Sequence, residues 1–215
     1  MAKKFRKITL ILLFFAFLST NKALSFNGHR EGANYGRGHE DTLWSLPLGE
    51  LSEEEREAIL YMREEEKLAR DVYLTLYQHY GLIILANIAE SEQNHMNSVK
   101  MLIDRYGLDD PVTNEEDIGN FTNPQLAALY NELVEKGLLS EIEALKVGAL
   151  IEELDIHDLE ERLAIIDQED VQMVFERLKA GSYNHLQAFV SALSAYGEEY
   201  NPQYLPQEEF EDLKK

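Results

Sequence analysis

Residues 62–73 read MREEEKLARDVY, a run in which charged side chains interrupt the apolar spacing of a helix. Steps of three and four residues place Met62, Glu66 and Tyr73 on one face, and that face is apolar except at Glu66. A lone buried carboxylate is unfavourable unless a charged group pairs with it. The stretch therefore predicts an amphipathic helix that presents one carboxylate to a partner in the core.

The same interruption recurs in three other predicted helices. The apolar stripe of the second helix is broken by Glu92 and His95, and that of the third by Glu152. The stripe of the fourth helix is broken by Ser182 and His185. Four helices that break the apolar rule near their middles predict a shared polar site.

Helix caps set the bounds of these elements. Capping boxes at Ser52 and Ser140 open two helices, and glycines such as Gly81 end them. The four long helices are predicted over residues 52–81, 82–107, 140–166 and 167–197. A crossover over 108–139 carries a short helix that begins at Asn123-Pro124, and no β pattern is present. The sequence predicts an all-α fold, an antiparallel four-helix bundle with a long helix-containing crossover between helices 2 and 3.

The polar residues also agree in height. Glu66 lies 15 residues before the turn at Gly81, and Glu92 and His95 lie 11 and 14 residues after it. At a rise of about 1.5 Å per residue they are nearly level. The same count gives the same result for the other helix pair, so we expect one polar layer across the core.

Carboxylates and imidazoles that converge in a dry core would repel or desolvate one another unless cations lay between them. Glu92 and His95 are three residues apart, so one helical turn presents both. The chain has no cysteine, which leaves oxygen and imidazole nitrogen as ligands. Carboxylate with imidazole suits iron, manganese or zinc. A hydrogen-bonded network without metal is the alternative reading.

The pattern resembles the ferritin-like superfamily, and the segment around residues 66–73 is similar to the first helix of rubrerythrin-type members. The runs at 62–73, 143–160 and 182–189 resemble the uncharacterised DUF2202 family. The resemblance implies a ferritin-like bundle over residues 51–197 with two divalent metal ions, iron foremost. The implied metal ligands are Glu66, Glu92, His95, Glu152 and His185, with Glu92 and Glu152 as bridges and the histidines as terminal ligands.

One position departs from the ferritin-like pattern. The fourth helix has Ser182 where the family places the glutamate of Glu-x-x-His, so one carboxylate is missing. Asp155, one turn after Glu152, is the expected compensating ligand. Tyr73 and Ser182 are expected beside the ligands.

Three functions follow from this reading. The first is a di-iron oxidoreductase, an oxidase or peroxidase that reacts with dioxygen or peroxide and takes electrons from an external donor or from ferrous iron. The second is a non-catalytic secreted metal-binding protein. The third is a metal-free helical interaction scaffold. The sequence assigns no catalytic residue, and a homo-oligomer is compatible with all three.

The termini carry separate predictions. Basic residues precede an apolar run over 8–18, and together they resemble a secretory signal peptide over 1–25. The apolar run is too short for a bilayer span of about 20 residues. We therefore expect an extracytoplasmic protein without a stable membrane span. An uncleaved anchor is the alternative. Residues 26–50 read as a flexible Gly/His-rich linker and 198–215 as an acidic disordered tail. A net charge of −20 disfavours nucleic acid as a partner.

The remaining acids of the helices are predicted to lie on solvated faces, and His157 is predicted to be exposed. These acids are Glu64, Glu65, Glu90, Glu141, Glu153 and Glu160. Gly181 could divide the fourth helix, but the apolar spacing continues through it, which favours one helix.

Overall fold

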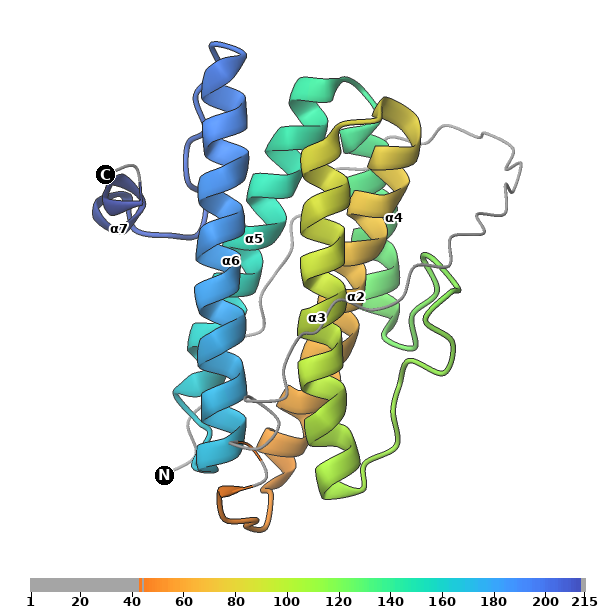
Figure 1. The fold of residues 1–215 in the computed structure, drawn as a ribbon, viewed down its shortest axis with the longest axis vertical. Helices are drawn as coiled ribbons and strands as arrows, with labels where there is room; N and C mark the ends of the chain where they lie inside the picture. The colour runs from red at the N-terminus through yellow and green to blue at the C-terminus, as the bar shows by residue number, and fades with distance from the viewer. Residues whose placement is uncertain (1–42, 44, 214–215) are drawn as a thin grey trace. The chain divides into compact units, whose positions relative to one another are not determined.

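The computed structural model describes residues 43 and 45–213, and within them every regular element is a helix (Figure 1). The helices are α2 (Glu53–Tyr80), α3 (Ile83–Tyr106), α4 (Pro124–Gly137), α5 (Glu141–Leu163), α6 (Glu169–Ala195) and α7 (Gln207–Asp212). The predicted all-α class is confirmed. The proposed signal peptide over 1–25 lies outside the described residues. None of the helices described is long and apolar enough to cross a membrane.

The predicted caps define most helix ends. Ser52 accepts a hydrogen bond from the backbone N–H of Glu55, and the Glu55 carboxylate accepts one from the N–H of Ser52. Gly81 ends α2 with a φ of 70°, a left-handed conformation that favours glycine. Helix α6, predicted over residues 167–197, spans Glu169–Ala195, with Gln168 as its cap residue. It continues through Gly181 as one helix, as predicted.

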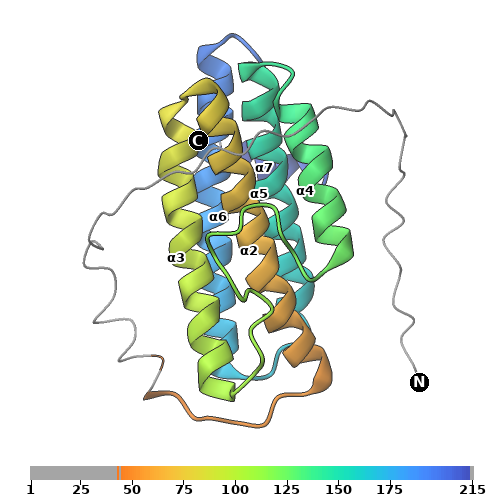
Figure 2. The same ribbon diagram turned by 90° about the vertical axis from the view of Figure 1, so that its right-hand side faces the viewer.

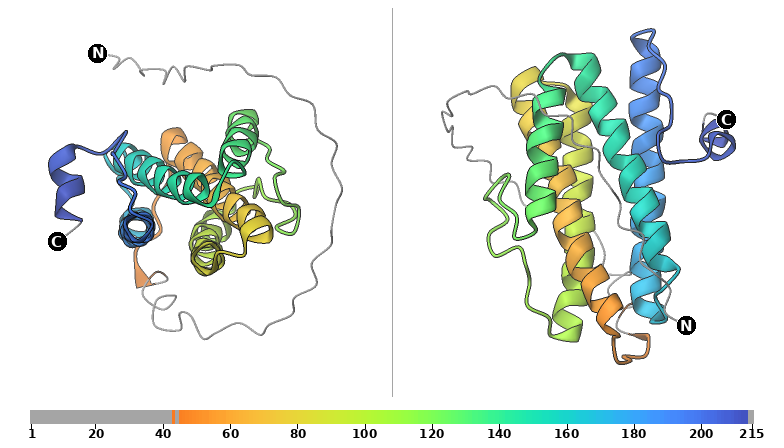
Figure 3. Two further views of the ribbon diagram at one scale, coloured as in Figure 1. Left: turned by 90° about the horizontal axis from the view of Figure 1, so that it is seen from above. Right: turned by 180° about the vertical axis from the view of Figure 1, so that it is seen from behind.

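The four long helices pack in two pairs, α2 with α3 and α5 with α6, and α4 lies against α2 and α5 (Figures 1 and 2). Seen from above, α2 and α5 lie in the middle. Helices α3 and α6 lie on one side of them and α4 lies on the other (Figure 3). The apolar core forms two separate clusters. On α2, one cluster takes residues 58–62 and the other takes 68–76, and the predicted polar layer falls between them.

The segment after α6 differs from the disordered tail expected over 198–215. Tyr200, Leu205 and Phe210 are buried in the core, and α7 lies within this segment. The carboxylate of Glu153, itself fully buried, accepts hydrogen bonds from the Tyr200 hydroxyl and from the backbone N–H groups of residues 203–205. One acid on α5 therefore fixes the segment to the bundle.

Candidate metal centre

Four helices bring the five predicted ligands to one layer. Glu66 comes from α2, Glu92 and His95 from α3, Glu152 from α5 and His185 from α6. The three carboxylates are each 1% exposed, and the imidazoles are buried with only their outer edges near the surface. The helical spacing thus predicted these neighbours correctly.

Glu92 lies at the middle of the group. Its Oε2 atom is 2.8 Å from Nδ1 of His95, and its Oε1 atom is 2.7 Å from Nδ1 of His185. Each imidazole also faces a second carboxylate, at 3.2 Å from Nδ1 of His95 to Glu66 and 3.3 Å from Nδ1 of His185 to Glu152. The two rings stack with centroids 5.3 Å apart. The layer therefore has two similar halves that share one carboxylate.

Several buried atoms of this layer lack a hydrogen-bond partner. They include Oε1 of Glu66, Oε1 of Glu92, Oδ1 of Asp155 and Nδ1 of His185. Oε1 of Glu92 and Nδ1 of His185 are nevertheless paired by charge, at 2.7 Å. Buried polar atoms are otherwise nearly always paired. Converging oxygen and nitrogen atoms without partners fit the donor set of a divalent metal ion.

The outer edges of the ligands are held by neighbouring groups. The Tyr73 hydroxyl donates to Oε1 of Glu152 at 2.6 Å, and Ser91 Oγ lies 2.8 Å from Nε2 of His185. Gly181 lies against His95, because a Cβ at that position would be 2.5 Å from Nε2 of the ring. Such outer contacts fix ring orientation and leave Nδ1 of both histidines facing the carboxylates.

Asp155 and Ser182 meet on the α5–α6 side of the layer. The Ser182 hydroxyl donates to Oδ2 of Asp155, and both side chains are buried. Oδ1 of Asp155 remains free of hydrogen bonds. The predicted compensating acid thus lies beside the serine that replaces the expected glutamate.

Burial makes the carboxyls of the layer weak acids. It is the main cause that raises the pKa of Glu66 well above its usual range, with the Asp155 charge next. Burial and the Glu92 charge raise the pKa of Glu152 to about 6. Burial, with the charges of Glu92 and Glu152, raises the pKa of Asp155 to about 7. Glu92 is the exception, because its two imidazoles outweigh burial and hold its pKa below the usual range.

The imidazoles shift in the complementary direction. Burial alone would lower the pKa of His185, but the charges of Glu152 and Glu92 raise it to about 10. Against the same effect of burial, Glu92 and Glu66 raise the pKa of His95 well above its usual value. Without metal, protons supply the positive charge that this layer requires, so a metal ion would have to displace them.

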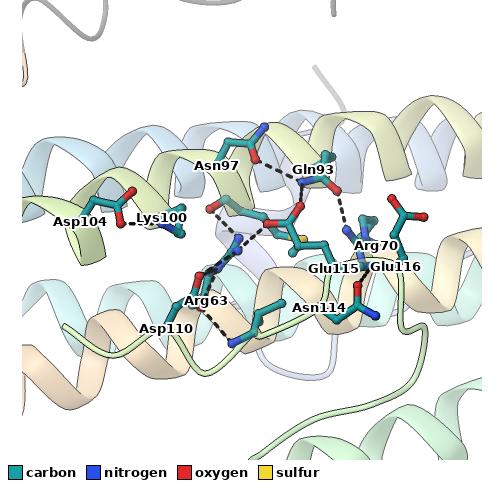
Figure 4. Close-up of polar contacts among 12 residues, drawn as sticks. Arg63, Arg70, Gln93, Asn97, Lys100, Asp104, Asp110, Asn114, Glu115 and Glu116 are labelled. Atoms are coloured by element: carbon teal, nitrogen blue, oxygen red, sulfur yellow. Dashed lines mark hydrogen bonds and ion pairs between the residues drawn. The ribbon is translucent and has the colours of Figure 1, made fainter. Parts of the chain in front are cut away.

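A second polar network, which the sequence reading missed, joins the crossover to α2 and α3 (Figure 4). Arg63, 1% exposed, donates to the backbone carbonyl of Met96 at 3.0 Å and pairs with Asp110 and Glu115. Glu115 in turn accepts from Gln93 at 3.0 Å. Gln93 lies within the candidate ligand turn 92–95, and Met96 directly follows it. The crossover therefore holds this turn against α2.

Several acids expected on solvated faces are buried. Glu64 accepts hydrogen bonds from the backbone N–H groups of Thr122 and Asn123. The Glu65 side chain extends from α2 toward the acids of α5. Glu153 is buried as described above, whereas Glu90, Glu141 and Glu160 are exposed as predicted. His157, predicted to be exposed, is half-buried against Tyr204. The apolar stripe of residues 62–73 marks one face of α2, but the opposite face, with Glu64 and Glu65, is covered as well.

Comparison with known proteins identifies the family. The model of the uncharacterised protein domain DUF2202 matches residues 55–215. The chain belongs to the DUF2202 family. An uncharacterised protein of this kind, MJ0754 from Methanocaldococcus jannaschii, is 56% identical over 169 residues, which cover 79% of this chain and 91% of that protein.

A crystal structure of the hypothetical protein MJ0754 is similar to this DUF2202 chain, with a TM-score of 0.77 and 56% sequence identity. The match covers 79% of this chain and 96% of that one. The resemblance to DUF2202 seen in the sequence is therefore correct. MJ0754 carries no stated activity, so function has to be argued from the site.

Proposed function

We propose that this protein is a ferritin-like helical bundle whose polar layer binds two divalent metal ions, iron foremost, with manganese and zinc as alternatives. One observation carries the proposal. Glu92 offers one carboxylate oxygen to each of two buried imidazoles, and the atoms between them include unpartnered donors of the kind that ligate metal. Oε1 of Glu66 and Oδ1 of Asp155 are buried in the same layer without a hydrogen-bond partner, whereas buried polar atoms are nearly always paired.

The donor set divides into two half-sites. Glu66, His95 and Asp155 supply one, because Asp155 is the charge that acts most strongly on Glu66. Glu152 and His185 supply the other, and Glu92 is common to both. Asp155 takes the place of the glutamate that Ser182 replaces in the ferritin-like pattern. The second half-site has fewer charged oxygens, so we expect it to bind its metal more weakly.

A bound pair of iron ions would supply redox chemistry toward dioxygen or peroxide. The chain itself orients the ligands and excludes water from the layer. Tyr73 holds the outer oxygen of Glu152, and Ser91 holds the far nitrogen of His185. The chain has no cysteine for an additional iron centre, so electrons would come from an external donor or from ferrous iron. We propose an oxidoreductase of this kind, exported by its N-terminal signal.

The decisive experiment is metal stoichiometry by mass spectrometry on the full chain, purified without a histidine tag. We expect close to two metal ions per chain, lost in Glu92→Ala and strongly reduced in His185→Ala. Glu90→Ala and His79→Ala are matched controls, because both side chains are exposed on the same set of helices. No metal after aerobic and anaerobic loading would contradict the proposal and leave a helical scaffold.

The asymmetry at Ser182 favours a second candidate, a non-catalytic metal-binding protein. Asp155 belongs to the half-site of Glu66, so the half-site of Glu152 and His185 keeps fewer charged oxygens. One tightly bound metal, with no accelerated oxidation of added Fe(II), would select this function. Two metals with rapid Fe(II) oxidation would select the oxidoreductase.

A further inference from the structure

A line of buried acids leads away from the metal layer along the contact between α2 and α5. Asp155 and Asp158 follow one another on α5, one turn apart, which corresponds to about 4.5 Å of helix rise. Glu65 faces them from α2, and its charge interacts with both. The exposed fractions are 8% for Glu65, 6% for Asp155 and 9% for Asp158.

This line has free ligand atoms. Oε2 of Glu65 and Oδ1 of Asp155 are buried without a hydrogen-bond partner. The neighbouring cation, Arg162, does not satisfy them. Its guanidinium lies 4.0 Å above the Tyr61 ring and 3.9 Å from Oδ2 of Asp158, and its Nε atom also lacks a partner. The unpartnered oxygens of Glu65 and Asp155 are therefore left for a further cation to bind.

The line reaches the surface at its outer end. Ligand atoms of His157, Asp158 and Glu161 lie within 4.8 Å of one another, close enough to bind one metal ion together. His157 is half-buried and Glu161 is exposed. Asp158 belongs both to this outer group and to the buried line. At the inner end, Asp155 belongs to the metal layer.

We propose that Glu65 and Asp158 form a transit site through which a divalent cation passes from the surface group at His157 and Glu161 to the metal layer. This rests on the proposed function. Along α5 the steps from Glu161 to Asp158 and from Asp158 to Asp155 are three residues each, about 4.5 Å of helix rise, and Glu65 adds a carboxylate from α2. At Asp158 the cation takes over from Arg162, whose guanidinium lies 3.9 Å from the carboxylate. It then moves inward because Asp155 and the imidazole layer offer more ligand atoms.

Uptake kinetics of Co²⁺ on the metal-free full chain test the passage, with the visible absorbance of bound Co²⁺ as the readout. We expect Glu65→Gln to load at least ten times more slowly than the wild type and to reach the same final stoichiometry. His157→Ala, a change near the surface, should also slow loading, to a smaller extent. Slower loading in this variant could not be explained by a folding defect caused by the change at Glu65. Glu160→Gln, which removes one exposed acid from the same helix, should load at the wild-type rate.

The outcomes separate the two proposals. Absence of Co²⁺ uptake by the wild type would overturn both the metal centre and the passage. Normal uptake by the wild type, with an equal rate in Glu65→Gln, would overturn the passage alone. Slow Fe(II) oxidation with unchanged Co²⁺ uptake in Glu65→Gln would also overturn it, because the acids would then carry protons instead of metal.

Discussion

Oε1 of Glu92 lies 2.7 Å from Nδ1 of His185, and the two side chains form a buried ion pair. The other oxygen of the same carboxylate lies 2.8 Å from Nδ1 of His95. The Nδ1 atoms of two imidazoles thus converge on one carboxylate. Their Nε2 atoms face away from it, toward Ser91 for His185 and toward Gly181 for His95. This arrangement is the basis of the first prediction.

Chelation should destabilise the protein. A ligand present at 100 times its dissociation constant stabilises the folded state by about 2.7 kcal/mol. For a chain of this size that corresponds to a Tm change of about 5–10 °C. We expect EDTA to lower the Tm of the metal-loaded wild type by this amount and to leave Glu92→Ala unchanged, as measured by circular dichroism. Equal melting of the wild type with and without EDTA would contradict a metal centre.

The metal-free protein should lose stability as pH rises from 5 to 9. The raised pKa values of Glu152 and Asp155 mean that the folded state holds protons that the unfolded chain has released, so their contribution falls up to about pH 7. The raised pKa of His185, about 10, acts in the same direction above pH 6.5.

Asp155→Asn isolates one part of this pH dependence. The variant should be more stable than the wild type at pH 8 without metal, and the difference should shrink as pH falls below 7. Urea unfolding at several pH values measures it. A difference that grows at low pH would contradict the assignment.

Gly181→Ala should disturb His95 specifically. Alanine in a helix interior is favoured over glycine by about 1 kcal/mol, but here its Cβ would lie 2.5 Å from Nε2 of His95. We expect a folded variant whose Co²⁺ affinity falls at least tenfold. Histidine NMR signals should show a shift confined to one imidazole, and unchanged affinity would show that the ring can move without cost.

Glu153→Ala should release the C-terminal segment. The carboxylate accepts from the Tyr200 hydroxyl and from three backbone N–H groups, so we expect a loss of about 3 kcal/mol in the free energy of unfolding. Limited proteolysis should then cut within residues 199–206. Glu160→Ala, an exposed acid on the same helix, is the control. Equal protease resistance in both variants would argue against this anchor.

Arg63→Lys should weaken the hold of the crossover on the ligand turn. A lysine cannot reproduce the planar set of donors that serves Asp110, Glu115 and the Met96 carbonyl together. We expect a loss of about 2–3 kcal/mol of stability together with weaker Co²⁺ binding. Arg56→Lys, at an exposed ion pair with Glu53, should change stability by less than about 1 kcal/mol.

The sequence predicted the layer because its signal is local. Each ligand interrupts an apolar stripe of its own helix, and the turn at Gly81 fixes the relative height of α2 and α3. The division of the core into two apolar clusters follows from the same pattern. The sequence signals for the helix caps are also local. Ser52, Asn123 and Ser140 each lie at the expected helix start.

What the sequence did not reveal depends on partners far along the chain. Glu64 and Glu153 look like ordinary surface acids until the crossover and the C-terminal segment cover them, and Glu65 is covered by α5. Ser91 contacts His185 across 94 positions, and no pattern within α3 indicates it. The acidic composition after residue 197 suggested disorder, whereas three buried apolar side chains in that segment decide its packing.

Helix α2 has no solvent-facing side from Met62 to Tyr73, because core, crossover, α3 and α5 surround it. A helix confined on every side cannot rotate or slide to suit its ligand. Glu66 is therefore held at a fixed reach before any ion arrives. The proposed metal centre would therefore select among cations by their radius and preferred geometry, since a helix confined in this way would not reshape itself around an ion.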